Sequence, residues 1–416
     1  MDTEESGASG NANTPELYKR YRLNLEKDIG LLDFSKKGDE YFEEFSGNIA
    51  ERLHINIDAV VGKKGYMLND SSVRFGKDSK KGSAGHVIWA DEKDLVEIIE
   101  KYTDRKVIIE CGENEKRKVV VVFANMDLPL VTKIEIKAAR GSKLEVMEIF
   151  TSKASRNSLN LSFSGIEVGS GAEVEINALH NEDANTNAVH FGNVSMKESG
   201  RIRINEVYEG GKNLVARNYI DAAGYGSQAE INSTLISSGE QRFDVFNTLV
   251  NSVSGTSCLG ETKSVLTGKS INFIKDMAFI PKMSSGSRSY IKERAILMSK
   301  DARASLLPDM SIYENDVKAS HSAAAAPIDA EAEFYLMSRG LTLDKSANMV
   351  ARGFLSDIIS KIEDGAAKAI IMSHVNDKLM NGRFGELLES NLSGVWEEHA
   401  KNTANFFEGG VKYSNG

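Results

Sequence analysis

The side chains able to carry out chemistry in this chain are few and widely spaced. Neither HxH nor HxxxH, the pairs typical of zinc sites, occurs among its seven histidines. Its two cysteines, Cys111 and Cys258, are too few for a disulfide framework and stand in no CxxC or Cys/His zinc pattern. A GxxxxGK[ST] phosphate loop is also missing, and the Gly/Lys-rich segment 76–86 lacks its spacing. The pattern therefore indicates no catalytic residue and no nucleotide-binding site.

The histidines differ in the sequence patterns around them. Three fall within helical patterns, where a surface position or a satisfied core position is expected: His54, His374 and His399. His180 and His190 flank the loop NEDANTNAV, where a metal role is an alternative to a structural one. His321 stands in KASHSAAAAPID, between a strand-rich segment and a helical segment. That position at a seam makes it the histidine that most needs an explanation.

The two cysteines also allow different interpretations. Cys111 ends an apolar strand and is expected to be buried and inert. Cys258 lies in GTSCLG, where it is either a reactive thiol or a small residue in a β turn.

Composition excludes several classes of partner. The chain has 416 residues, 51 basic and 60 acidic, and a net charge of -9, which argues against nucleic acid as a partner. The N-terminal sequence MDTEESGASGNANTPE is acidic where a secretory signal is basic and then apolar. No window approaches eighteen apolar residues, so we expect no membrane partner. With only two cysteines, a cytoplasmic protein in a reducing compartment is expected.

The central part of the chain reads as many short strands with a weak repeat. From residue 106 to 326, alternating β-branched segments are separated by Gly, Ser and Asn. Equivalent apolar positions at Leu144, Val174, Ile202 and Ala229 are separated by 30, 28 and 27 residues. This spacing favours the stacked coils of a β-helix over a β-sandwich with irregular spacing.

Different patterns flank this core. Residues 1–14 are expected to be a disordered tail, and 15–105 a mixed, mostly helical region. Residues 327–416 are expected to form a helical domain. Its first helix should span Asp329 to Ser338, between Pro327 and Gly340. The next carries an apolar stripe from Leu343 to Ile358, and further helical patterning covers 366–379 and 385–407.

The segment 314–341, ENDVKASHSAAAAPIDAEAEFYLMSRGL, is similar to the junction motif of the SufB and SufD family of iron-sulfur cluster assembly proteins. That motif has an acidic-Val-Lys-x-Ser-His segment, small residues, then Ile-Asp and Phe-Tyr-Leu-x-Ser-Arg-Gly. Upstream, ERAILMSKDARASLLPDMSIYE looks like the final coil of the family, and MVARGFLSDII resembles its second terminal helix. The resemblance implies a mainly β fold, a right-handed parallel β-helix flanked by an N-terminal α/β region and a C-terminal helical domain.

The resemblance also implies a function. Such a chain would be a non-catalytic scaffold that pairs through its β-helix with a second copy or a SufB/SufD paralogue. Its terminal helices would dock a SufC-type ABC ATPase, which hydrolyses the ATP. The assembled complex would carry a transient iron-sulfur cluster, receive sulfur from a cysteine desulfurase system and serve apoprotein acceptors. Six residues form the expected ATPase-docking set: Phe334, Tyr335, Arg339, Arg352, Gly353 and Phe354.

The expected cluster residues depart from the family pattern. Scaffold members carry a cysteine on the penultimate coil, where this chain has Glu293, and many have Glu after the histidine, where it has Ser322. We therefore expect His321, Glu293 and Ser322 as cluster or metal candidates, with Cys258 as a weaker thiol. Because thiolates normally hold iron-sulfur clusters, a SufD-like half of a heteromer is favoured over a divergent SufB-type homodimer. A structural adaptor and a carbohydrate-active β-helix protein are the alternative functions.

Overall fold

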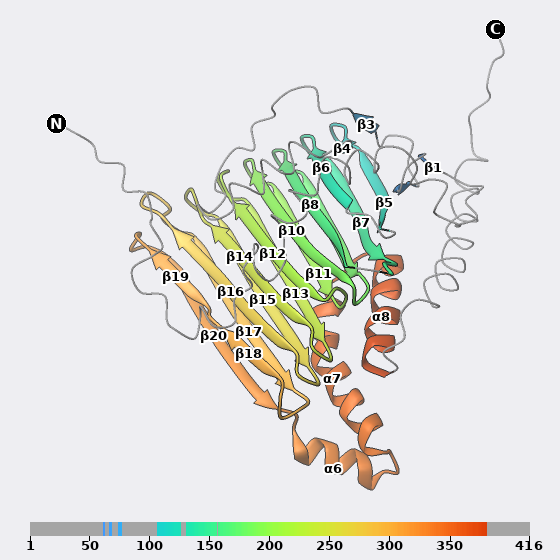
Figure 1. The fold of residues 1–416 in the computed structure, drawn as a ribbon. Coiled ribbons are helices and arrows are strands. Elements are labelled where there is room, and N and C mark those ends of the chain that lie inside the picture. The colour runs from blue at the N-terminus through green and yellow to red at the C-terminus, as the bar shows by residue number, and fades with distance from the viewer. Residues whose placement is uncertain are drawn as a thin grey trace.

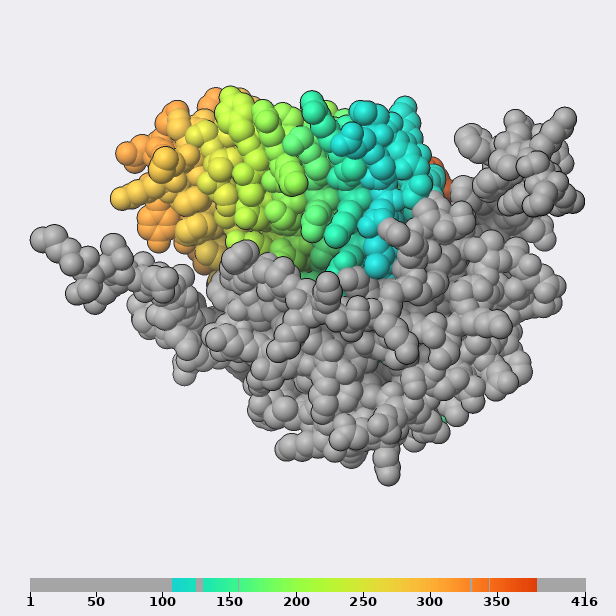
Figure 2. All heavy atoms as spheres, turned by 90° about the horizontal axis from the view of Figure 1, so that it is seen from above, coloured from blue at the N-terminus to red at the C-terminus, as the bar shows by residue number. Residues whose placement is uncertain are grey.

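The computed structural model describes residues 106–125, 130–155 and 157–380, together with three short strands earlier in the chain. Most of the region 15–105, the expected tail 1–14 and the helical pattern of 385–407 lie outside the described residues. Figure 1 shows successive coils stacked side by side, with helices at one flank. Figure 2 shows the same coils in contact, with colours running in chain order.

Each coil contributes one strand to each of two sheets. Sheet A contains, in spatial order, β1 (Val61–Gly62), β2 (Tyr66–Leu68), β5 (Lys116–Asn125), β7 (Lys143–Ser152), β9 (Glu173–Asn181), β11 (Arg201–Tyr208), β13 (Gln228–Ser237), β15 (Ser257–Leu266), β17 (Arg288–Leu297) and β20 (Lys318–Pro327). Sheet B contains β3 (Arg74–Gly76), β4 (Lys106–Cys111), β6 (Leu130–Ala138), β8 (Ser158–Val168), β10 (Thr186–Met196), β12 (Asn213–Asp221), β14 (Arg242–Val250), β16 (Ile271–Ile280) and then β18 (Arg303–Leu306) and β19 (Asp309–Ile312), which both pair with β16.

The stacking register confirms the repeat expected from the sequence. Leu144 pairs with Val174, Val174 with Ile202, and Ile202 with Ala229, always between parallel strands. The same column continues through Cys258 to Ser289. A parallel β-solenoid, and not a sandwich, is therefore the fold, since equivalent positions of successive coils lie directly above one another.

One corner of the solenoid requires a left-handed backbone in every coil. Gly141 and Gly171 have φ of 66° and 63°, and Ser199 occupies the equivalent corner with φ 54°. Glycine is favoured there because it has no Cβ to clash in this conformation. Amides at this corner donate to carbonyls of the next coil, as from Gly141 to Ser170 at 3.0 Å and from Ser199 to Tyr225 at 2.9 Å. The Gly-rich turns of the sequence thus serve strand reversals.

The C-terminal helices α6 (Ala330–Ser338), α7 (Leu343–Ser360) and α8 (Gly365–Met380) confirm the helical patterns expected for these residues. The Asp329 side chain caps α6 by accepting from the amides of Glu331 and Ala332. The apolar stripe of α7, including Leu355 and Ile358, packs on the outer face of sheet A against residues such as Val207 and Val265. Figure 1 shows α7 and α8 lying along that sheet, with α6 beyond its end.

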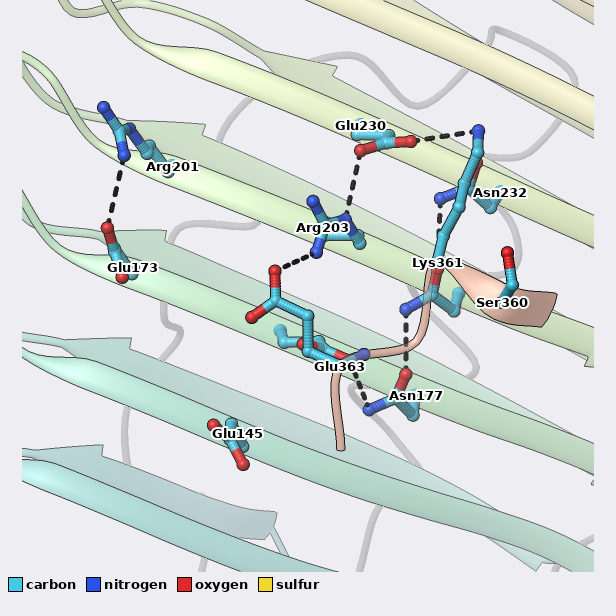
Figure 3. A network of polar contacts seen from close by, with 12 residues as sticks. Glu145, Glu173, Asn177, Arg201, Arg203, Glu230, Asn232, Ser360, Lys361 and Glu363 are labelled. Carbon is cyan, nitrogen blue, oxygen red and sulfur yellow. Dashed lines mark hydrogen bonds and ion pairs between the residues drawn. The ribbon is translucent and has the colours of Figure 1, made fainter. Parts of the chain in front are cut away.

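The connection between α7 and α8 is held to sheet A by a charged network (Figure 3). Lys361 lies 3.1 Å from Glu230 and 2.8 Å from Glu261, and it donates to Asn232 at 2.8 Å. Arg203 joins Glu230 to Glu363 at 3.0 and 2.6 Å. The network borders a hollow of about 260 Å³ in the outer face of sheet A. These contacts fix the helical region to the solenoid.

No helix among the described residues is long and apolar enough to cross a membrane.

Candidate functional site

The last coil brings two of the expected cluster residues onto neighbouring strands. His321 on β20 pairs in register with Ile291 on β17, and Ala323 pairs with Glu293. Register partners and residues two positions apart share a face of a sheet, so His321 and Glu293 are diagonal neighbours on the inner face of sheet A. With strands about 4.8 Å apart and a rise of about 3.3 Å per residue, such diagonal positions are about 8 Å apart along the backbone.

The two residues differ strongly in exposure. Glu293 is fully buried inside the solenoid, whereas His321 is exposed on the final strand. Ser322 pairs with Lys292, and both lie on the opposite, outer face of sheet A. The structure thus brings His321 and Glu293 together and directs Ser322 away from them.

The surroundings of Glu293 disfavour the charged form of its carboxyl. Its Oε1 accepts a hydrogen bond from the backbone amide of Asp276 at 2.8 Å, and the carboxyl also interacts with the backbone of Leu307. Burial, and then the charge of neighbouring Asp276, raise the pKa of the Glu293 carboxyl well above its ordinary value. Its surroundings therefore favour the protonated form of the carboxyl.

A network of hydrogen-bonded polar groups extends from Glu293 into the interior of the solenoid. Asp276 accepts from Thr262 at 2.7 Å and from Asn247 at 2.8 Å. Asn218 donates to Asn247 at 3.0 Å and to Glu206 at 2.8 Å. Burial raises the pKa of Glu206 to about 7 and, with the charge of Glu206, that of Glu148 to about 8. The sequence did not predict this network, because its residues alternate with apolar residues in the same way as in other strands of the chain.

The two cysteines lie far from solvent. Cys258 is fully buried in the column between Ala229 and Ser289. Burial raises the pKa of its thiol to about 12, so that the thiolate needed for nucleophilic attack is suppressed. Cys111 is buried as well, and its thiol donates to the backbone oxygen of Glu115 at 3.4 Å. Cys258 is a core residue in this fold.

The expected docking residues divide into two groups. Phe334 and Tyr335 on α6 are 72% and 57% exposed, and the Arg339 guanidinium lies over the Tyr335 ring at 5.2 Å. The neighbouring Met337 is also exposed. Phe354 instead is half-buried, with the Lys263 ammonium 4.7 Å from its ring.

Arg352 and Gly353 lie on the exposed side of α7. Helices α6 and α7 thus present aromatic and basic side chains to solvent, while Phe354 packs between α7 and sheet A.

A second polar cluster lies inside the solenoid, away from the last coil. His180 lies at the end of β9, Glu182 in the connection that follows it and His190 on β10. They place one ligand atom each within 4.8 Å of one another, and all three are buried. His180 and His190 are ten positions apart in the sequence, so the sequence alone does not show that they lie close together. The turn between β9 and β10 brings them together.

The described residues thus define a parallel β-solenoid with helices packed on the outer face of one sheet. The family model for the SUF system FeS cluster assembly SufBD core domain matches residues 121–354. Since this match covers more than half of the 416 residues, the chain belongs to the SufBD family of iron-sulfur cluster assembly proteins.

Individual relatives match over shorter segments. The chain is 31% identical over 139 residues to an iron-sulfur cluster assembly SufBD family protein of Mycobacterium bovis, covering 33% of this chain and 16% of that protein. It is 22% identical over 236 residues to the SufBD family protein ycf24 of Pyropia yezoensis, covering 55% of this chain and 48% of the relative. It is 32% identical over 87 residues to the iron-sulfur cluster assembly protein SufD of Escherichia coli, covering 21% of each. The chain thus spans less than half the length of these relatives.

Proposed function

We propose that this chain is the non-catalytic scaffold subunit of a SUF-type iron-sulfur assembly complex in the cytoplasm. The observation that carries the proposal is the last coil, where the exposed His321 and the buried Glu293 share the inner face of sheet A. Family membership supports the setting, since the matching model is that of the SUF cluster-assembly core.

The subunit pairs with a second β-solenoid through its final coils. Strand β20 is hydrogen-bonded to β17 on one side and pairs with no other strand among the described residues. It is exposed along nearly its whole length, including the four alanines 323–326. An open strand edge with small side chains invites a partner strand, which would satisfy its unpaired backbone groups. A partner seated there would enclose His321 at the interface.

The cluster is cargo, and this chain supplies part of its ligands. His321 offers an imidazole and Glu293 a carboxyl, whereas both cysteines are buried elsewhere. Iron accepts nitrogen and oxygen donors, but clusters are normally held by thiolates. The remaining ligands therefore come from a paralogous partner and from the delivered sulfide, which favours a SufD-like role.

The ATPase docks on the helical region. Phe334, Tyr335 and Met337 leave a large apolar area in contact with water on α6, next to Arg339. Aromatic residues and arginine are enriched among residues that dominate interface energetics. ATP hydrolysis by the partner accounts for the missing phosphate loop of this chain.

Anaerobic co-expression with a SufC-type ATPase, a SufB-type paralogue and a cysteine desulfurase tests the proposal. We expect a co-purifying complex with iron, acid-labile sulfide and visible charge-transfer absorbance. A complex that forms with the ATPase but never contains iron or sulfide would instead identify a structural adaptor. Failure to capture either partner would refute the assembly role.

A further inference from the structure

We propose that the interior of the solenoid holds a single divalent transition-metal ion of the Fe²⁺ to Zn²⁺ class, bound by His180, Glu182 and His190. This site is distinct from the interface that would carry the cluster, since it lies on β9, β10 and their connection, whereas the cluster candidates lie on β17 and β20. It does not rest on the proposed scaffold function, because it concerns the isolated chain.

The donor set suits such an ion. Two imidazoles and one carboxylate form the ligand set of many zinc sites and of mononuclear iron sites, which leave further positions open. The three ligand atoms lie within 4.8 Å of one another. Two ligands that are each about 2.1 Å from one ion can be at most about 4.2 Å apart. Binding one ion therefore requires the most distant ligand atoms to approach each other by about 0.6 Å or more.

His180 is the strongest sign of a missing partner. It is 2% exposed, and neither of its ring nitrogens has a hydrogen-bond partner among the described residues. Its ring is stacked between Phe150 at 4.8 Å and Tyr208 at 4.6 Å, which fixes its plane. A buried imidazole without hydrogen bonds costs free energy that a phenylalanine at the same place in the stack would avoid. A bound ion would supply the absent interaction.

The other two side chains are already oriented as ligands. The His190 Nε2 lies 3.1 Å from Oε1 of Glu182, and its Nδ1 contacts the hydroxyl of Ser162 at 2.6 Å. Asn160 donates to the same Oε1 at 3.0 Å, while Oε2 of Glu182 is buried without a partner. If the His190 Nδ1 donates to Ser162, its Nε2 lone pair faces the carboxylate, an arrangement that a cation between them stabilises. Ser162 and Asn160 would then be the outer contacts that hold the ligands in place.

The buried position of the three ligands determines how the metal ion would enter the site. The ligands lie inside the stacked coils, so we infer that the ion is taken up while the solenoid folds and exchanges slowly afterwards. The bound ion should therefore survive a brief chelator wash of the native protein, unlike ions at the surface.

The test uses the full chain produced in minimal medium supplemented with Co²⁺, or separately with Zn²⁺, followed by a chelator wash and desalting. We expect about one ion per chain by elemental analysis, and visible d–d absorption for Co²⁺. His180→Phe keeps a ring in the Phe150–Tyr208 stack but removes the nitrogens, and should lower the metal content roughly tenfold or more. Glu182→Gln, nearly isosteric, should do the same.

The matched control is His374→Gln. His374 is another buried histidine next to a glutamate, with Glu209 at 3.0 Å, but it lies outside the cluster. This variant should retain the metal content of the wild type. The proposal fails if the wild type holds under about 0.1 ion per chain after both supplements, or if the folded His180→Phe and Glu182→Gln variants retain as much metal as the control.

Discussion

Glu293 and His321 lie on the same face of adjacent parallel strands, two register positions apart, yet the carboxyl is fully buried and the imidazole is exposed. The inner face of the last coils therefore carries one polar group in the interior and one at its open end. A group placed between them would contact a proton-holding acid on one side and a solvent-accessible base on the other.

Glu293→Gln should stabilise the chain at alkaline pH. The folded-state pKa of Glu293 is raised by burial, so its stabilising contribution is present at low pH and is lost as pH rises above the ordinary carboxyl range near 4.5. One such proton changes the free energy of unfolding by up to about 1.4 kcal/mol per pH unit. Urea denaturation at pH 5.5 and 8.5 should show a gain for the variant that grows with pH. Glu173→Gln, an exposed glutamate of the same sheet, should show no such trend. An equal effect of Glu293→Gln at both pH values would contradict this assignment.

His321→Ala should leave the fold intact and lower the cluster content of the reconstituted complex sharply. Because His321 is exposed, its loss should change the free energy of unfolding by under about 0.5 kcal/mol. Iron and acid-labile sulfide per complex are the measurement. Ser322→Ala is the control, since Ser322 is the next residue but faces the other side of the sheet. Unchanged cluster content in the double variant His321→Ala/Glu293→Gln would place the cluster elsewhere.

Phe334→Ala combined with Tyr335→Ala should weaken capture of the ATPase. Truncating aromatic anchors at an interface commonly costs about 2 kcal/mol, which is roughly thirtyfold in affinity. Since both rings are mostly exposed, the melting temperature of the isolated chain should barely move. Met283, at a solenoid turn and 84% exposed, offers a control variant, Met283→Ala, that removes apolar surface outside the helices. Capture at wild-type affinity by the double variant would exclude α6 from the docking surface.

Both cysteines should resist thiol reagents in the native protein. Cys258 is fully buried with a thiol pKa raised to about 12, and Cys111 is 2% exposed. Labelling at pH 8 should therefore be far slower than in denaturant, where two thiols per chain become reactive. Rapid stoichiometric labelling of Cys258 under native conditions would restore it as a thiol candidate.

The repeat could be read from the sequence because stacking in a solenoid follows local chemistry. Leu144, Val174 and Ile202 are first apolar residues after a small-residue turn, and each lies above the last in the structure. The helices at Ala330–Ser338 and Leu343–Ser360 were equally readable, because caps and apolar periodicity are local signals. The SufBD family was recognisable from the motif around His321, and the match of the core-domain family model supports it.

Burial and long-range proximity could not be read in the same way. Glu293 is the middle residue of the charged run Lys-Glu-Arg, which suggests a solvated strand. The pleat nevertheless directs its carboxyl inward, while Lys292 points outward. Cys258 allowed both a reactive and a core interpretation until its column in the stack was known.

By itself the sequence determined the coil length, the strand alternation, the terminal helices and the seam at His321, since each depends on residues close together in the chain. Only the tertiary structure decided that Ser322 faces away from His321, and that His180, Glu182 and His190 converge inside the solenoid. The physical reason is that facing side chains across a solenoid are set by inter-strand register and by the turn between sheets. A shift of one residue in that register would send each of these groups to the opposite face.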